Sequence, residues 1–194
     1  MLEPDLLLTA YRRGIFPMAV NARGTIGWFS PDPRAIIPLD DRFHIPHGLR
    51  RTLKKAPFEV TFDRAFPAVI RECASHRKEG TWISRQILAS YSRLHKLGHA
   101  HSVEVWANGE LVGGLYGVHI GAVFFGESMF HRATDASKVA LVTLVERLRQ
   151  RSFVMLDTQW QTPHLQQFGT REIPRAEYLE ILERAVAFPC EFYQ

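Results

Sequence analysis

Residues 101–130 constrain the fold of this chain more than any other stretch. They read HSVEVWANGELVGGLYGVHIGAVFFGESMF, with alternating apolar residues on both sides of Asn108-Gly109. An Asn-Gly pair between such flanks is the strongest short-range signal for a two-residue β-hairpin turn. Gly121 is typical of a second turn. The stretch therefore predicts a three-stranded antiparallel meander.

Helices and further strands surround the predicted meander. Apolar periodicity and capping signals predict helices at 4–13, 64–75, 84–97, after Asp135 and from Pro174, and strands at 58–62 and 153–160. This order of elements predicts a mixed α+β fold. It is consistent with the layout of the acyl-CoA N-acyltransferase folds.

The segment SPDP at 30–33 is the best candidate for a domain boundary, because its two prolines exclude regular structure. We expect a small N-terminal domain at 1–33 and a larger domain at 34–194. With 194 residues, of which 46% are hydrophobic and 23% charged, the chain has enough apolar material for a substantial core.

Charge and cysteine content restrict the partners and the compartment. The net charge of +4 permits a polyanionic partner without requiring one. The two cysteines, Cys73 and Cys190, have neither metal-binding nor redox spacing, which suggests a reducing compartment. The first residues lack the basic region of a signal peptide, and no apolar run approaches the roughly 18 residues of a membrane span. We expect a soluble, cytoplasmic protein.

The strand that contains MLDTQ carries the first candidates for chemistry. Asp157 and Gln159 are two residues apart, so strict alternation places them on one face with Thr158 opposite. Both lie where an apolar strand gives way to polar sequence, which is a usual place for functional groups. The alternative is a strand end with a turn-forming aspartate.

The stretch FFGESMF places a carboxylate among apolar side chains. Strict alternation puts Phe125, Glu127 and Met129 on one face. If that face is buried, the charge of Glu127 is costly without a cation as partner. The alternative is a solvated face on which the two apolar residues are ordinary surface residues.

Two further features fit a nucleic acid. Trp82, just before a predicted helix, either plugs that helix against the sheet or stacks on a nucleobase. A basic stripe at helical spacing is either a solvated helix face or a phosphate-binding surface. The stripe comprises Arg50, Arg51, Lys54 and Lys55.

Several other reaction classes lack their motifs. The histidines have no HExxH-like spacing, no GxSxG elbow surrounds Ser30 or Ser128, and GGLYG lies inside a predicted strand, not in a phosphate loop. We therefore expect neither a bound metal nor a cofactor.

Taken together, the motifs of this chain resemble the leucyl/phenylalanyl-tRNA–protein transferases. The matching pieces are AYRRGIFPM, WFSPDPRAIIPL, GTWIS, LHKLGHAHSVEVW, LVGGLYGV, FFGESMF, ASKVAL, LDTQ and HLQQFG, which follow the family order from residue 10 to about residue 178. Two departures are Met18, where many members have tryptophan, and a shorter N-terminal segment.

The resemblance implies an enzyme that moves leucine, phenylalanine or methionine from an aminoacyl-tRNA to the N-terminal arginine or lysine of a protein. The product would be an N-degron, which is recognised for ATP-dependent proteolysis. The fold implied is a small N-terminal domain followed by a catalytic domain similar to the acyl-CoA N-acyltransferases. We expect a monomer.

The resemblance also implies roles for the candidate residues. Glu127 would bind the cationic N-terminal residue of the acceptor, Trp82 the terminal adenosine, and the basic stripe the tRNA acceptor arm. The pocket for the donor side chain would consist of Leu115, Phe124, Met129 and Leu141.

Asp157 and Gln159 would have the central roles in catalysis. A neutral amide is a poor base, so we expect Gln159 to accept a hydrogen bond from the attacking amine and orient it. Asp157 then either fixes Gln159 or takes the proton, directly or through water. The leaving ribose oxygen or a neighbouring tRNA hydroxyl is a further proton acceptor.

Two rival functions make different demands on the sequence. A CoA-dependent N-acetyltransferase would need a Q/R-x-x-G-x-G/A loop, and the sequence contains none. A non-catalytic RNA-binding module would explain the basic stripe and Trp82, but neither the Asp157–Gln159 pair nor Glu127.

Overall fold

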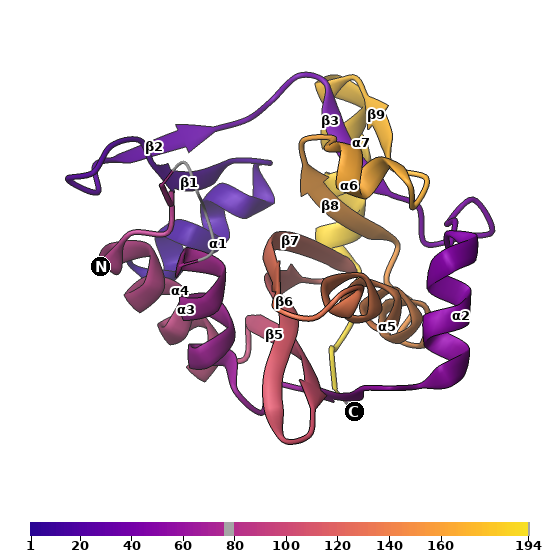
Figure 1. Cartoon of the computed structure of the whole chain (residues 1–194). Coiled ribbons are helices and arrows are strands. Elements are labelled where there is room, and N and C mark those ends of the chain that lie inside the picture. The colour runs from indigo at the N-terminus through magenta and orange to yellow at the C-terminus, as the bar shows by residue number, and fades with distance from the viewer. Residues whose placement is uncertain (76–79, 194) are drawn as a thin grey trace.

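The computed structural model describes residues 1–75 and 80–193 (Figure 1). The helices are α1 (Pro4–Arg12), α2 (His47–Lys55), α3 (Phe66–Ser75), α4 (Arg85–Lys96), α5 (Ala136–Gln150), α6 (Pro163–Gln166) and α7 (Arg175–Ala187). The strands are β1 (Phe16–Ala19), β2 (Ile26–Phe29), β3 (Arg34–Ile37), β4 (Glu59–Phe62), β5 (Ala100–Ala107), β6 (Glu110–Ile120), β7 (Val123–His131), β8 (Met155–Gln159) and β9 (Arg171–Ile173). The predicted α+β class is confirmed.

The predicted meander is present as β5, β6 and β7, paired antiparallel in that order. Asn108 and Gly109 have φ angles of 52° and 80°, the two positive values that a type I′ turn requires. Gly121, at the second turn, has a φ of 52°, and a Cβ there would lie 2.5 Å from the carbonyl oxygen of Val186 in α7. Glycine is therefore needed at Gly121 for both conformation and space.

The meander belongs to a mixed seven-stranded sheet in the order β4-β5-β6-β7-β8-β3-β9. Helices cover both of its faces. One apolar cluster packs α1, α3, α4 and α7 against the sheet, and the other packs α2 and α5 against it. Phe124 and Phe125 are consecutive and fully buried, one in each cluster, as alternation in a two-sided sheet requires.

A β-bulge interrupts this alternation in β7. Gly126 pairs with Gly117 of β6 and Ser128 pairs with Tyr116, so Glu127 is an extra residue without a partner across the strand pair. Beyond the bulge the faces exchange, and Met129 packs in the same cluster as Phe124. The expectation that Phe125, Glu127 and Met129 share one face is therefore wrong for Met129.

The bulge also marks the place where the sheet opens. β7 and β8 are parallel, but only Val123–Phe125 pair with Met155–Asp157. β7 then continues to His131 without pairing to β8, because a bulge bends and twists its strand. The second half of β7 and the end of β8 thus form two edges that side chains can line.

The N-terminal residues contribute α1 and a separate two-stranded sheet, β1-β2. They nevertheless share a core with the rest of the chain, because Leu7, Tyr11 and Phe16 pack in one cluster with Tyr91 and Phe125. The division at residue 33 stays a prediction. Its physical content is a change of sheet at β3, the first strand of the large sheet along the chain.

Details at element ends differ from expectation. Asp135 directly precedes α5, but its carboxylate makes no capping hydrogen bond; it accepts one from Thr52 and pairs with Lys138. Pro174 precedes the first residue of α7. β9 and α6 lie in a stretch where no regular structure was expected.

Among the helices in the described ranges, none is long and apolar enough to cross a membrane.

Candidate active site

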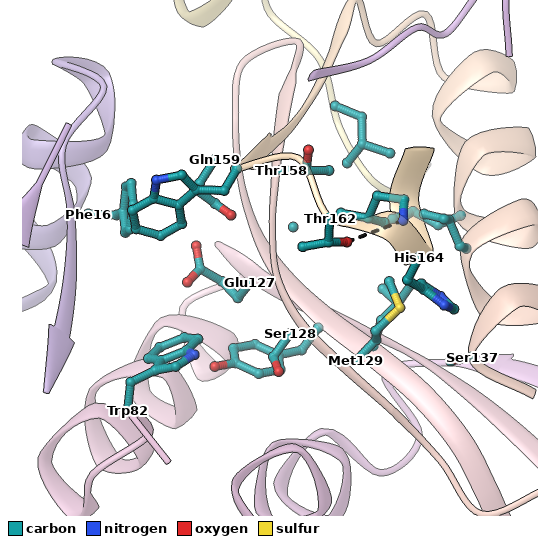
Figure 2. Close-up of a pocket in the computed structure, with 18 of the residues that line it drawn as sticks. Phe16, Trp82, Glu127, Ser128, Met129, Ser137, Thr158, Gln159, Thr162 and His164 are labelled. Atoms are coloured by element: carbon teal, nitrogen blue, oxygen red, sulfur yellow. Dashed lines mark hydrogen bonds between the residues drawn. The ribbon is translucent and has the colours of Figure 1, made fainter. Parts of the chain in front are cut away.

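A pocket of about 550 Å³ lies where β7 and β8 separate (Figure 2). Apolar side chains from β6, β7, α5 and β8 form one part of its lining: Leu115, Met129, Leu141, Leu144 and Leu156. Glu127 and Gln159 also line it, and their polar ends face one another across the pocket (Figure 2). The pocket therefore combines an apolar recess with a carboxylate and an amide.

Six of the twelve predicted site residues meet at this pocket. Those that line it are Trp82, Leu115, Glu127, Met129, Leu141 and Gln159. Phe124 and Asp157 are fully buried and do not line it. Phe124 packs against Phe192, with ring centroids 5.8 Å apart, so it supports the pocket from behind.

Glu127 is held by two tyrosine hydroxyls. The hydroxyl of Tyr11 donates to Oε1 at 2.6 Å, and the single proton of the Tyr91 hydroxyl is shared between Oε2, at 3.5 Å, and the Tyr11 oxygen. Burial, with a smaller contribution from repulsion by Asp157, raises the pKa of Glu127 to about 8. The Tyr11 hydrogen bond and the charge of Arg34 act in the opposite direction and are included in this value. Within the described ranges, no lysine or arginine forms a salt bridge with Glu127.

Asp157 has the opposite environment. Arg34 donates to both of its oxygens, from Nε to Oδ1 at 2.9 Å and from Nη2 to Oδ2 at 2.6 Å, and both side chains are at most 1% exposed. The hydroxyl of Tyr178 donates to Oδ2 at 2.8 Å, and the backbone N–H of Gln159 donates to Oδ1 at 2.9 Å. Arg34 also donates to the carbonyl oxygen of Gly14 at 2.9 Å. This network ties the N-terminal segment, β3, α7 and β8 together.

Gln159 has a strained backbone at the end of β8. Its φ is 61°, which is uncommon for a residue other than glycine, and strained residues of this kind tend to cluster at functional sites. A register shift at the β3–β8 pair accompanies it, and both Thr158 and Gln159 line the pocket. The expectation that Thr158 lies on the opposite face from Gln159 is therefore wrong. The side-chain nitrogen of Gln159 is buried and has no hydrogen-bond partner within the described residues.

The sequence interpretation missed an aromatic wall on one side of the pocket. Phe16, Met18 and Trp160 line the pocket together with Trp82, and Trp160 packs edge-on against Phe16. Figure 2 shows Phe16 and Trp82 on the same side of Glu127. The available signal was a tryptophan directly after Gln159, next to the residues already suspected of chemistry.

It also missed a polar corner at the other end of the pocket. His131, Ser137, Thr162 and His164 line this end, and Figure 2 places His164 on the side away from Trp82. Burial lowers the pKa of His164, and the nearby Lys138 and His131 lower it further. Its imidazole is therefore neutral at pH 7. These residues come from different elements, so no local pattern joins them.

The predicted basic stripe lies outside the pocket, on α2. Leu49 of this helix is buried and Thr52 hydrogen-bonds to Asp135, which leaves the basic side chains exposed on the outer face. In Figure 1, α2 lies on the side of the molecule opposite α4, the helix that follows Trp82. Any ligand that touches both the stripe and Trp82 must therefore extend across the molecule.

His101 and His119 of the meander lie elsewhere and form an internal network with Asp63. His101 hydrogen-bonds through Nδ1 to Asp63 at 2.6 Å and through Nε2 to His119 at 2.9 Å. Burial, together with the neighbouring His101 and His99, lowers the pKa of His119 to about 4. In the described ranges, no group of three or more histidine, cysteine or acidic side chains could hold a metal ion.

Comparisons with solved structures give distant likenesses. A ribosomal-protein-alanine N-acetyltransferase from Brucella melitensis matches 57% of this chain and 84% of its own, with a TM-score of 0.42 and 13% identity. L-PGS from Bacillus licheniformis matches 84% of this chain and 55% of its own, with a TM-score of 0.45 and 16% identity. Neither likeness assigns a substrate or a reaction.

Comparisons of sequence are far closer. The family model described as leucyl/phenylalanyl-tRNA protein transferase matches residues 36–183, and that of its N-terminal domain matches residues 1–32. Leucyl/phenylalanyl-tRNA–protein transferases from Akkermansia muciniphila and Herpetosiphon aurantiacus are 58% and 53% identical over 95% and 98% of this chain, and over 96% and 98% of their own lengths. We conclude that the chain belongs to the leucyl/phenylalanyl-tRNA–protein transferase family and is an enzyme of the transferase class.

Proposed function

We propose that this enzyme transfers leucine, phenylalanine or methionine from an aminoacyl-tRNA to the N-terminal arginine or lysine of an acceptor protein. The observation that supports this best is the composition of the pocket: Gln159 lines it together with an apolar recess and a carboxylate that forms no salt bridge with a lysine or arginine of the described residues. One part suits an apolar donor side chain, and the other suits a cationic acceptor.

The apolar recess is suited to donor side chains that are not branched at Cβ. Leu115, Met129 and Leu141 line it, and Leu144 and Leu156 extend it. Size alone discriminates between apolar side chains by only about 1–3 kcal/mol per methylene, so rejection of β-branched donors must come from the shape of the recess near the ester. Phe124 contributes by packing behind these residues.

Glu127 is the proposed acceptor site. Burial raises its pKa to about 8. The hydrogen bonds from the Tyr11 and Tyr91 hydroxyls lower the pKa only in part, because the hydroxyls bring no positive charge. A guanidinium or ammonium group from the acceptor would supply that charge and favour the ionised form. Burial raises the pKa of both tyrosines well above their usual value, and the charge of Glu127 raises it further, so their hydroxyls stay protonated and donate.

The chemistry needs little help from a strong base. The acceptor's α-amine has a pKa of about 7.7–8.0, so a useful fraction is neutral near pH 7. Its nitrogen attacks the ester carbonyl, the C–N bond forms, the bond to the ribose oxygen breaks, and the amine proton ends on that oxygen. Holding the amine beside the ester supplies most of the acceleration. The amide oxygen of Gln159 accepts a hydrogen bond from the amine and orients it.

Asp157 acts, in this proposal, through Gln159. Its carboxylate already accepts hydrogen bonds from Arg34, Tyr178 and the Gln159 backbone, and it does not line the pocket. Of the two roles that the sequence left open, this geometry supports positioning over proton transfer. The hydrogen bond to the Gln159 N–H helps to hold the strained φ of that residue.

The tRNA would contact two separate regions. The basic stripe on α2 would bind phosphates of the acceptor arm, and Trp82 would contact the terminal adenosine in the pocket. Changing the four stripe residues to serine should weaken tRNA binding and flatten its dependence on salt. An unchanged salt dependence would remove the stripe from the tRNA interface.

Because aminoacyl-tRNA and nascent proteins share the cytoplasm, we propose that the enzyme acts there. Its product would be an N-degron, which is formed before proteolysis.

The deciding experiment is transfer of radiolabelled leucine from charged tRNA onto a peptide that begins with arginine. The same peptide beginning with alanine is the control. Label on the arginine peptide alone is the expected result. Label on neither peptide, with tRNA still bound, would overturn the proposal in favour of a non-catalytic RNA-binding role.

A further inference from the structure

We propose that Trp160 is a stacking platform for the purine ring of the donor's 3′-terminal adenosine. This inference rests on the proposed function, because it takes an aminoacyl-tRNA as the donor. It extends the adenosine contact that the resemblance implied for Trp82 to Trp160, which the sequence interpretation did not use.

Exposure separates the four tryptophans of the chain. Trp106 donates from its indole to Thr61 at 2.8 Å, and Trp82 is partly buried. Trp28 and Trp160 are 41% and 42% exposed. Of these two, only Trp160 lines the pocket. A large indole left open to a binding pocket is available to a planar ligand, whereas Trp28 is an ordinary surface aromatic on β2.

The indole of Trp160 is fixed before any ligand arrives. Its ring meets that of Phe16 at 85° with centroids 5.2 Å apart, and that of Phe29 at 67° with centroids 6.3 Å apart. The backbone is fixed too, because the N–H of Trp160 donates to the carbonyl oxygen of Thr158 at 2.7 Å. A side chain already held in place loses little conformational entropy on binding, which favours stacking.

The wall has an aromatic ring at each end. Phe16 and Met18 are two residues apart on β1 and both line the pocket. At the start of β1, the ring of Phe16 contacts the indole of Trp160. At the end of β1, the N–H of Ala19 donates to the carbonyl oxygen of Trp82 at 3.1 Å. Met18, between them, offers a flexible thioether in place of a flat ring, so Trp160 supplies the second aromatic surface of this wall.

The position of Trp160 along the chain matches the chemistry of the donor. The aminoacyl ester is carried on the ribose of the terminal adenosine, so the base lies one sugar away from the reacting carbonyl. Gln159, which we place beside that carbonyl, is the residue directly before Trp160. The strained φ of 61° at Gln159 turns the chain so that both side chains line the pocket. The base therefore falls within reach of the indole.

The test compares donors with and without the base in Trp160→Ala, Trp160→Phe and the matched control Trp28→Ala. The first probe is phenylalanyl-tRNA in the transfer reaction, and the second is an adenosine that carries phenylalanine through a stable 3′-amide, used for binding. The third probe is phenylalanine methyl ester, which keeps the side chain and the ester but has no base. AMP and ATP separate a site for the tRNA end from one for free nucleotides.

We expect Trp160→Ala to raise KM for phenylalanyl-tRNA and Kd for the amide about tenfold, the effect of losing about 1.4 kcal/mol of stacking. KM for the methyl ester and kcat should stay within about twofold, and Trp160→Phe should restore most of the affinity. Trp28→Ala should behave as wild type. AMP and ATP should bind much more weakly than the amide.

Equal losses for the tRNA and the methyl ester would overturn the inference, because they would show that Trp160 acts only by supporting Gln159. Unchanged values for all donors would overturn it as well. Tight ATP binding that depends on Trp160 would assign the surface to free nucleotides instead. Failure of the wild-type enzyme to transfer from any charged tRNA would overturn the proposed function, which distinguishes the two outcomes.

Discussion

Asp157 and Glu127 are two carboxylates beside one pocket with opposite surroundings. Asp157 is fully buried in a bidentate ion pair with Arg34 and accepts further hydrogen bonds from Tyr178 and the Gln159 backbone. Glu127 lies on the β7 bulge, with tyrosine hydroxyls as its hydrogen-bond donors and a pKa raised to about 8. Arg34 forms a salt bridge with Asp157, whereas no lysine or arginine in the part of the chain that the structure describes forms one with Glu127.

The difference supports our proposal that one carboxylate has a structural role and the other binds the acceptor. A buried ion pair is costly to break, because the remaining partner is left with an uncompensated charge. A carboxylate without a cationic partner binds an incoming cation more strongly, because the cation relieves an existing penalty. We therefore propose that Asp157 belongs to the framework that holds Gln159 in place. Glu127, in contrast, would bind the acceptor.

Asp157→Asn should have the largest effect. The substitution leaves the buried guanidinium of Arg34 without its counter-charge, so we expect a loss of about 3–5 kcal/mol in the free energy of unfolding. Transfer activity should fall with it, because the Gln159 backbone loses a charged acceptor. Urea denaturation measures the first effect, and single-turnover transfer measures the second.

The exposed ion pair between Asp40 and Arg42 provides the control for this prediction. Both of its side chains are more than half exposed, so Asp40→Asn should cost less than about 1 kcal/mol. If Asp157→Asn cost no more than Asp40→Asn, the framework role of Asp157 would be wrong. Full stability with lost turnover would instead return Asp157 to the chemistry itself.

Glu127→Gln should have the next largest effect, on the acceptor and not on the fold. The amide keeps the size of the side chain and can still accept from Tyr11, but it carries no charge for an arginine. We expect kcat/KM for arginine-initiated peptides to fall about 10- to 100-fold, the range for a charge-assisted contact. The affinity for tRNA, measured by filter binding, should stay unchanged. A parallel loss of tRNA affinity would contradict the assignment.

The pH dependence of stability should show the smallest effect. The pKa of Glu127 rises from 4.5 in the unfolded chain to about 8 in the fold, so its stabilising contribution is complete below pH 4.5 and is lost as the pH rises to 8. Glu127→Gln is free of this loss. We expect equal melting temperatures for the two proteins near pH 4.5 and a melting temperature a few degrees higher for the variant already at pH 6, where part of the contribution is lost. A constant difference across this range would mean that Glu127 titrates normally.

The sequence determined the local structure of this protein. Asn108-Gly109 favours a tight hairpin turn, because that turn requires positive φ at two consecutive residues and this pair adopts it readily. The apolar spacing of the residues after Asp135 predicts α5. The motif pieces, which extend across nearly the whole chain, identified the family before any contact was known. These features depend on neighbours in the chain, so a pattern of residues is sufficient to recognise them.

Contacts between distant residues were decided only by the tertiary structure. Arg34 and Asp157 are 123 residues apart, and no local pattern pairs them. The bulge at Glu127 depends on the register between β6 and β7, and it reversed the expected face of Met129. Trp160 packs against Phe16 of β1, a contact that no local pattern predicts. Charge compensation, strand register and aromatic packing are set by which segments meet in space, and that information is absent from the spacing of residues along the chain.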